Sequence, residues 1–227
     1  MVKEIPIHES FLTWQGEGLH MGRSAYFIRT FGCPVHCPWC DSAGTWHKDY
    51  VPKDIKKLTP KLLADNAARS QPDFVVITGG EPTVHDLTDL TAELHNLGLQ
   101  VHLETSGAFK IKGDFDWITL SPKKWKKPLP ENISKSDELK IIVDHPEAIT
   151  EWIEDMGDFI TSQHIWLHPE WSRRQDKTIT DTITEWVKDF GHPYRAGYQL
   201  HKMYRADSLD SGSRPNVPLG GNQSLGY

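Results

Sequence analysis

Three cysteines, the only ones among the 227 residues, stand in one short segment as Cys33, Cys37 and Cys40. An odd, closely spaced set does not make a disulfide framework, so the CxxxCxxC spacing indicates metal ligands. Three thiolates can bind three irons of a four-iron cluster and leave the fourth iron open to another ligand. The alternative is a zinc site, which a fourth ligand such as His36 or His47 would complete.

A second chemically suggestive segment is Thr78-Gly79-Gly80-Glu81-Pro82, which follows a predicted buried strand. Two glycines let backbone carbonyls approach an ammonium group closely, and the Glu81 carboxylate adds negative charge. An ordinary strand-to-helix turn would also favour two glycines.

The composition is that of a globular protein, with 37% apolar and 25% charged residues. No apolar run of about 18 residues occurs, which argues against a transmembrane helix. The N-terminus carries charged side chains where a secretory signal would be apolar, so we expect a cytoplasmic protein without membrane contact. A net charge of −6 argues against a general binder of nucleic-acid backbones, and no direct nucleic-acid contact is expected.

Short apolar runs alternate with helical patterns, as is typical of an α/β fold with a mostly parallel sheet. Strands are predicted at 24–31, 74–77, 99–104, 117–120, 139–143, 165–168 and 198–203. Helices are predicted at 60–69, 87–97, 146–156 and 178–190, and the stretch 123–137 is predicted to be a loop. We expect one domain, 1–210, and a flexible tail, 211–227, whose Ser, Gly, Pro and Asn residues cannot bury a core.

Taken together, the cysteine loop, the Gly-Gly-Glu-Pro segment and the α/β pattern resemble the radical S-adenosylmethionine (SAM) superfamily. The resemblance implies a partial TIM-like barrel with a mostly parallel sheet. It also implies a 4Fe–4S cluster on Cys33, Cys37 and Cys40, whose open iron binds the amino and carboxylate groups of SAM. In that superfamily the reduced cluster splits SAM into methionine and a 5′-deoxyadenosyl radical, so no catalytic side chain is expected.

Further motifs are similar to those of one member family, 7-carboxy-7-deazaguanine synthase. In chain order these are 14–18 (WQGEG), Arg29, 40–42 (CDS), 104–107 (ETSG), 121–123 (SPK), 138–140 (ELK) and 199–202 (QLHK). The resemblance spans about residues 8–205. It implies a lyase that contracts the ring of 6-carboxy-5,6,7,8-tetrahydropterin to 7-carboxy-7-deazaguanine with loss of ammonia, in the biosynthesis of queuosine and related 7-deazapurines.

The same resemblance assigns residues to ligands. Contacts with the pterin are expected from Trp14, Gln15, Gly16, Glu17, Arg29, Thr78 and His201, with the Arg29 guanidinium on the substrate carboxylate. Contacts with SAM are expected from Gly79, Gly80, Glu81, Ser106, Ser121, Pro122, Lys123, His168, Pro169 and Glu170. The family usually has glutamine where this chain has His168, so the contact there is expected to differ.

The family also implies Mg²⁺, a hard cation that binds few protein oxygens. Ser42 matches the hydroxyl position that holds it, and Asp41 is the rival oxygen unless that carboxylate only closes its loop. A flavodoxin- or ferredoxin-type reductant and a homodimer are further expectations. Two alternatives stay open: another radical SAM enzyme such as a glycyl-radical activase, and a zinc-stabilised nucleic-acid-binding module with a basic patch of Lys123, Lys124, Lys126 and Lys127.

Overall fold

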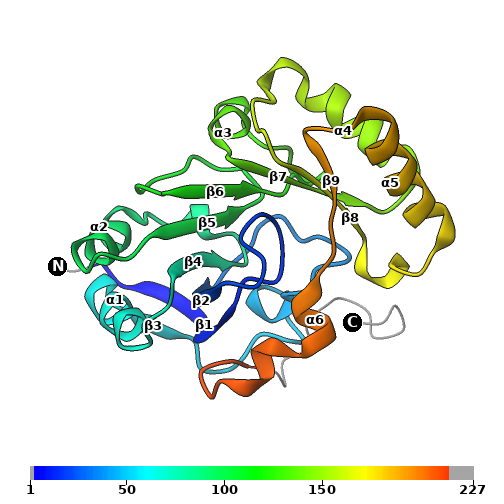
Figure 1. The fold of residues 1–227 in the computed structure, drawn as a ribbon. Coiled ribbons are helices and arrows are strands. Elements are labelled where there is room, and N and C mark those ends of the chain that lie inside the picture. Colours follow the sequence, from blue (N-terminus) through cyan, green and yellow to red (C-terminus); the bar gives the residue numbers. More distant parts are fainter. Residues whose placement is uncertain (1–2, 215–227) are drawn as a thin grey trace.

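A computed structural model describes residues 3–214 as one open, curved sheet of nine strands with helices on its outer face (Figure 1). The strand order is β3-β1-β2-β4-β5-β6-β7-β8-β9; the strands from β2 onward run parallel, and β1 is antiparallel to both its neighbours. The strands are β1 (Ile5–Trp14), β2 (Ser24–Thr30), β3 (Lys56–Leu58), β4 (Phe74–Gly79), β5 (Val101–Thr105), β6 (Trp117–Leu120), β7 (Glu138–Val143), β8 (Ile165–Pro169) and β9 (Tyr194–Ala196). This mostly parallel half-barrel confirms the predicted fold class.

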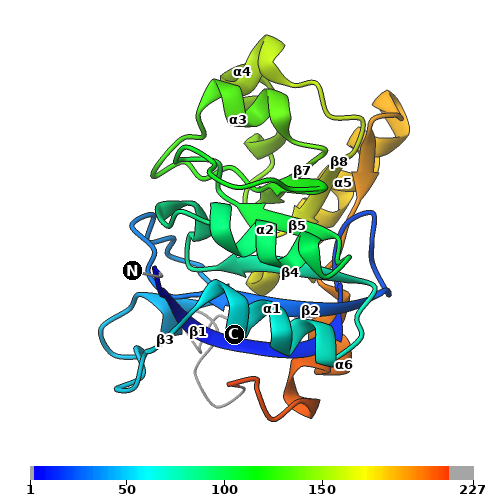
Figure 2. The same cartoon turned by 90° about the vertical axis from the view of Figure 1, so that its left-hand side faces the viewer.

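The helices that precede β9 cover the convex side of the sheet, and the last, short helix lies on the concave side (Figures 1 and 2). They are α1 (Pro60–Arg69), α2 (Thr88–Asn96), α3 (Pro130–Lys135), α4 (Ala148–Met156), α5 (Lys177–Phe190) and α6 (Leu200–Tyr204). The predicted start of α1 is confirmed: the Thr59 hydroxyl accepts the Leu62 N–H at 3.3 Å, and Pro60 supplies a first residue that needs no hydrogen bond.

Side chains alternate between two environments along each strand. On β7, the side chains of Leu139, Ile141 and Val143 pack in an apolar cluster with α4 and α5, while Glu138 and Lys140 belong to the opposite face. A second apolar cluster packs α1 and α2 on β4 and β5. Most of the core therefore lies between sheet and helices, while the opposite face of the sheet carries a smaller apolar cluster on β1, β2 and β4 together with polar side chains.

Two predictions about elements were wrong, and two strands were not predicted. The segment 198–203 contains the short helix α6 instead of a strand, because the edge position beside β8 is taken by β9 a few residues earlier. The predicted loop 123–137 contains α3, which begins at Pro130. The strands β1 and β3 were not predicted, since β1 interrupts its apolar alternation with buried His8 and Glu9.

Part of the predicted tail is described. The Gly212 backbone lies against Ser10 of β1, and the Arg214 N–H donates to Glu9 Oε2 at 2.6 Å. Residues 215–227 lie outside the described part of the chain. Within residues 3–214, none of the helices has both the length and the apolar character that crossing a membrane requires.

Candidate active site

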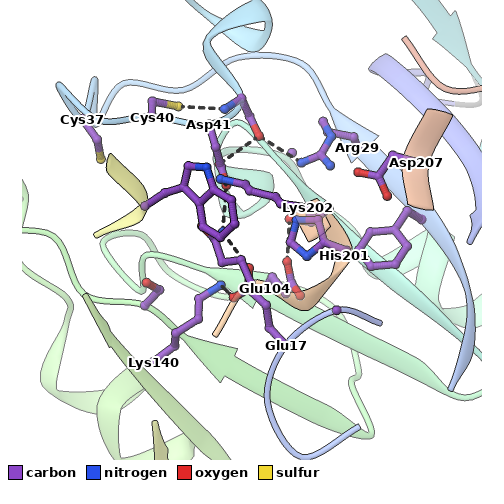
Figure 3. Close-up of a pocket in the computed structure, with 18 of the residues that line it drawn as sticks. Glu17, Arg29, Cys37, Cys40, Asp41, Glu104, Lys140, His201, Lys202 and Asp207 are labelled. Carbon is purple, nitrogen blue, oxygen red and sulfur yellow. Dashed lines mark hydrogen bonds and ion pairs between the residues drawn. The ribbon is translucent and has the colours of Figure 1, made fainter. Parts of the chain in front are cut away.

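A cavity of about 800 Å³ fills the hollow of the half-barrel (Figure 3). Parallel strands end at a common edge, so the residues at their carboxyl ends gather on one side of it. These include Thr78 of β4, Ser106 after β5, Ser121 after β6 and Glu170 after β8. The loop between β1 and β2 enters from the opposite, amino end and contributes to the floor. The cavity therefore has a wall from the strand ends and a floor to which this loop and several strands contribute.

The cysteine loop lies at the carboxyl end, directly after β2, and all three cysteines line the cavity. Cys40 Sγ accepts two N–H groups at 3.3 Å, from the Ser42 backbone and from Trp46 Nε1. Such N–H···S bonds are typical of cluster thiolates. Burial raises the pKa of Cys37 to about 11 and that of Cys40 to about 12, so these thiols hold protons that binding of iron would release.

The chemistry of this donor set fits a cluster better than zinc. Three thiols from one stiff loop face a cavity that is large enough for a further ligand, while the His36 ring is stacked on Trp46 with centroids 4.3 Å apart. Among residues 3–214, no three His, Cys, Asp or Glu side chains are arranged as a ready metal site. The fit to a cluster therefore rests on the type, spacing and position of the thiols.

The two glycines after β4 are required by close backbone approach. A Cβ on Gly80 would lie 2.3 Å from the Gly32 carbonyl oxygen, and one on Gly79, where φ is +143°, would lie 2.4 Å from the Thr30 oxygen. These contacts leave room only for glycine. The Gly79–Gly80 turn is thus packed against the residues that enter the cysteine loop, and a shift in one would move the other.

Glu81 is buried and its carboxylate already has several donors. It accepts the hydroxyls of Thr83 and Thr105, both at 2.6 Å, and the Ser106 backbone N–H at 2.8 Å. The side chain therefore ties the turn after β4 to the end of β5. A direct contact with the SAM ammonium, which the motif predicts, stays a prediction.

The floor of the cavity holds a buried ion pair. Glu17 and Lys140 approach to 2.5 Å with side chains 10% and 16% exposed, and Gln199 Nε2 donates to the other Glu17 oxygen at 2.8 Å. Burial opposes the charge on Glu17, but the Lys140 ammonium outweighs it and lowers the pKa of the carboxyl. The pair is therefore ionised, and its remaining lone pairs and protons face the cavity.

Glu104 is a second floor carboxylate. It accepts Gln15 Nε2 at 2.9 Å and the Thr78 hydroxyl at 3.1 Å, so three segments that are remote in the chain meet at one group. The neighbouring Gly16 lies under the His201 ring, where an added Cβ would be 2.2 Å from Nδ1. His201 belongs to α6, not to the end of a strand as predicted, and it lines the cavity from that helix.

Arg29 lines the cavity but is already paired. Its Nε donates to Glu9 at 2.7 Å and its Nη1 to the Ser42 hydroxyl at 3.1 Å. Burial alone would lower the pKa of this guanidinium, and Glu9 and Asp207 raise it instead. Asp41 beside it binds Gln199 Nε2 at 3.1 Å and Lys202 at 3.3 Å. Figure 3 shows these groups at the side of the cavity between the cysteines and the floor.

The structure brings together nearly all residues that the sequence analysis assigned to ligands. Those that line the cavity are Trp14, Gln15, Gly16, Glu17, Arg29, Cys33, Cys37, Cys40, Asp41, Ser42, Thr78, Gly79, Gly80, Glu81, Ser106, Ser121, Lys123, Pro169, Glu170 and His201. Pro122 and His168 are not among the lining residues, and the His168 side chain is fully buried. The assignments to SAM or pterin remain predictions.

Several lining residues were not predicted: Glu9, Glu104, Lys140, Gln199, Lys202 and Asp207. Four of these stand in segments that carry the family resemblance, 104–107, 138–140 and 199–202, so the signal was present although no role was assigned. Glu9 and Asp207 carry no such signal, because only the fold brings β1 and the segment after α6 to Arg29.

Comparisons with known proteins show the family to which the chain belongs. The family model described as "Radical SAM superfamily" matches residues 27–125. The chain is 41% identical to the 7-carboxy-7-deazaguanine synthase of Synechocystis sp. over 87% of this chain and 91% of the relative. It is 37% identical to that of Flavobacterium psychrophilum, over 87% and 90%. The crystal structure of QueE from Escherichia coli superposes with a TM-score of 0.74 at 30% identity, covering 87% of this chain and 95% of that one.

Both the matched model and the relatives imply a 4Fe–4S cluster and SAM, for which the three thiols and the cavity beside them provide the place. The shared fold and near-complete coverage of the relatives leave no large part of this chain unaccounted for. The chain therefore belongs to the 7-carboxy-7-deazaguanine synthase family of the radical SAM superfamily.

Proposed function

We propose that this protein contracts the ring of 6-carboxy-5,6,7,8-tetrahydropterin to form 7-carboxy-7-deazaguanine with loss of ammonia, as a step toward queuosine or related 7-deazapurines. The observation that carries the proposal is the cavity floor, where Gln15, Glu17, Glu104 and Lys140 present acceptors and donors within one network. A flat heterocycle with N–H groups along one edge and a carbonyl beside them matches such a set. The cysteine loop faces this floor across the same cavity.

Cys33, Cys37 and Cys40 would hold the 4Fe–4S cluster, and the Gly79–Gly80 turn and the strand ends at Ser106 and Ser121 would hold SAM. When bound, these groups supply the abstraction of a hydrogen atom from carbon 6 of the pterin. The protein's own part is to hold that carbon toward the cluster end and to keep water from the radical. Lys123 supports the wall, because its ammonium donates to the Ser121 carbonyl at 2.7 Å and to its hydroxyl at 2.6 Å.

The carboxylate of the pterin would lie toward Arg29. Glu9 and Ser42 engage Nε and Nη1 of this guanidinium, which orients the group, and Nη2, which donates no hydrogen bond to residues 3–214, would meet the anion. Glu9 is itself held by the Arg214 N–H. Arg29 is therefore a preoriented cation and not a flexible surface side chain, which reduces the entropy lost when the substrate binds.

Magnesium belongs to the same proposal. The Ser42 hydroxyl and the Asp41 carboxylate lie 3.4 Å apart on the cavity lining, and both are oxygen donors that suit a hard cation. Arg29 contacts the same Ser42 hydroxyl and Lys202 contacts the other Asp41 oxygen, so a divalent ion would bind there only with a negative substrate group beside it. Turnover that rises with Mg²⁺ in the parent and not in Ser42→Ala would support this ligand.

Two finer expectations come from the family resemblance. A flavodoxin- or ferredoxin-type donor would supply the electron, and the protein would act as a cytoplasmic homodimer. Replacing dithionite by a purified flavodoxin system and measuring the mass in solution by light scattering test these two points separately from the reaction.

The reaction is tested by anaerobic reconstitution with iron and sulfide, followed by incubation with SAM, reductant, Mg²⁺ and 6-carboxytetrahydropterin. We expect 7-carboxy-7-deazaguanine by mass spectrometry, dependent on each component. Formation of 5′-deoxyadenosine without the deazaguanine would leave the radical chemistry in place and overturn the substrate. A purified protein that holds zinc and cleaves no SAM would overturn both.

A further inference from the structure

The loop between β1 and β2, residues 15–23, is folded into the hollow of the half-barrel. It is closed at its base by two backbone bonds, from Gln15 N to Arg23 O at 2.9 Å and from Gly22 N to Gln15 O at 2.8 Å. The Leu19 N–H reaches across to Glu138 of β7 at 2.7 Å. Figure 1 shows this loop, in dark blue, in front of the sheet and not at its edge. The pocket floor therefore depends on what holds this loop in the hollow.

His20, at the far end of the loop, sits among three aromatic rings of the sheet. Its centroid lies 4.7 Å from His102, 4.7 Å from Trp117 in an edge-on arrangement, and 5.6 Å from Phe74. Phe74 and His102 are stacked on each other at 4.1 Å. We call Phe74, His102 and Trp117 the aromatic box. Pairs of this kind add stability beyond their buried area.

The aromatic box lies one layer below the carboxylates of the floor. The register pairs His102 with Trp117, and two residues later it pairs Glu104 with Thr119. Residues two apart on a strand share a face, so the box and Glu104 point into the same hollow. Gln15 at the start of the loop bonds to Glu104, and His20 further along packs in the box. The loop is thus attached to two successive layers of side chains.

The ring of His20 acts here as an aromatic surface. Its Nε2 is buried and finds no hydrogen-bond partner among residues 3–214, while Nδ1 lies 3.0 Å from Arg23 Nη1 within the same loop. Burial and the nearby Arg23 lower the pKa of this histidine, which favours the neutral ring. Neither nitrogen reaches the cavity lining, so the ring has no chemical task in the reaction.

We propose that His20 is a positioning residue for the pterin: its insertion into the aromatic box holds the Gln15–Glu17 segment at the height where that segment meets the substrate. The inference rests on the proposed function. It predicts that the shape of the ring at position 20, and not its nitrogens, sets the affinity for the pterin. The cluster and SAM, at the other end of the cavity, are independent of it.

The test compares His20→Ala, His20→Phe and the control Leu19→Ala, an exposed side chain on the same loop. In reconstituted enzyme, His20→Ala should raise KM for 6-carboxytetrahydropterin by about tenfold and change kcat by less than about threefold. Iron content and affinity for SAM should be unchanged. His20→Phe restores the ring without its nitrogens and should have the KM of the parent, as should Leu19→Ala. His20→Gln, which keeps a polar side chain without a ring, takes the place of His20→Ala if that variant does not fold.

The outcomes separate the two proposals. If the parent enzyme forms no 7-carboxy-7-deazaguanine, the proposed function fails. If the parent is active and both ring-deleting variants keep its KM, the positioning role is overturned. If His20→Phe is as impaired as His20→Ala, the nitrogens are needed and the aromatic anchor is the wrong explanation.

Discussion

The two ends of the cavity are built in different ways. At the cluster end, one contiguous loop supplies all three thiols, and the N–H groups that reach Cys40 come from residues two and six positions away. At the floor, the partners of Gln15, Glu17 and Gln199 lie 89, 123 and 182 residues away in the chain. The cluster end is local and needs iron to acquire its charge, while the floor has its charges already paired by the fold. Changes at one end should therefore leave the other end working.

Cys40→Ala should give the largest difference between the functions of the two ends of the cavity. Removing one of three thiolates should prevent a stable cluster, so iron content and formation of 5′-deoxyadenosine should fall to background. Binding of the pterin to the anaerobic protein, measured by calorimetry, should stay within about threefold because the floor keeps its own contacts. His36→Ala, in the same loop, is the control that should keep the iron. Equal loss of pterin affinity in Cys40→Ala would contradict two independent ends.

At the floor, Lys140→Met should do the reverse: it should impair pterin binding and leave the cluster intact. It leaves the buried Glu17 carboxylate without its cation, which should lower the free energy of unfolding by about 3 kcal/mol and raise KM for the pterin about 100-fold. Iron content should not change. Lys61→Met, which breaks an exposed pair with Asp65 on α1, should cost less than about 0.5 kcal/mol.

The double variant Glu17→Gln with Lys140→Met separates stability from binding. Replacing both members of the pair removes the unpaired charge, so stability should largely return while KM for the pterin stays high. Recovery of the KM together with stability would mean that the pair only supports the fold.

Two glycine variants form a matched pair, and each should impair the function of one end of the cavity by about tenfold while sparing the other. The Cβ of Gly80→Ala would meet the Gly32 carbonyl, so the cysteine loop must move and SAM cleavage should slow. The Cβ of Gly16→Ala would meet the His201 ring, so KM for the pterin should rise while SAM cleavage persists. Both variants should be measured for SAM cleavage and for KM of the pterin. If each variant loses both functions to a similar extent, the cavity behaves as one unit.

The same contrast explains what could be predicted from the sequence. The thiols, the Gly-Gly turn and the parallel strands β2 and β4 to β8 follow from spacing and periodicity over a few residues, and they were predicted. Glu9 was missed because its partner Arg29 lies on another strand and no motif surrounds it. Lys140 stands in the 138–140 motif, but its partner Glu17 belongs to a loop that is remote in the chain, so the motif alone does not show the ion pair. The wrongly predicted strand at 198–203 has a similar origin. The edge of the sheet beside β8 has room for one strand, and β9 occupies it, which the local sequence of 198–203 does not show.

The smallest expected effect concerns the layer beneath the floor. Burial and the neighbouring His20 and Arg23 lower the pKa of His102 to about 3, although Asp116 opposes this, while an unfolded chain titrates it at 6.5. Between pH 6.5 and 3 the unfolded state therefore binds more protons, and stability falls as the pH falls through this window. From pH 7.5 to 5 this one residue should cost about 2 kcal/mol. His102→Phe keeps an aromatic ring in the box and should remove that part of the loss, as measured by urea unfolding at both pH values. His36→Phe, at an exposed position, is the control; if His102→Phe loses as much stability as the parent on acidification, the neutral ring in the box is not the group that titrates.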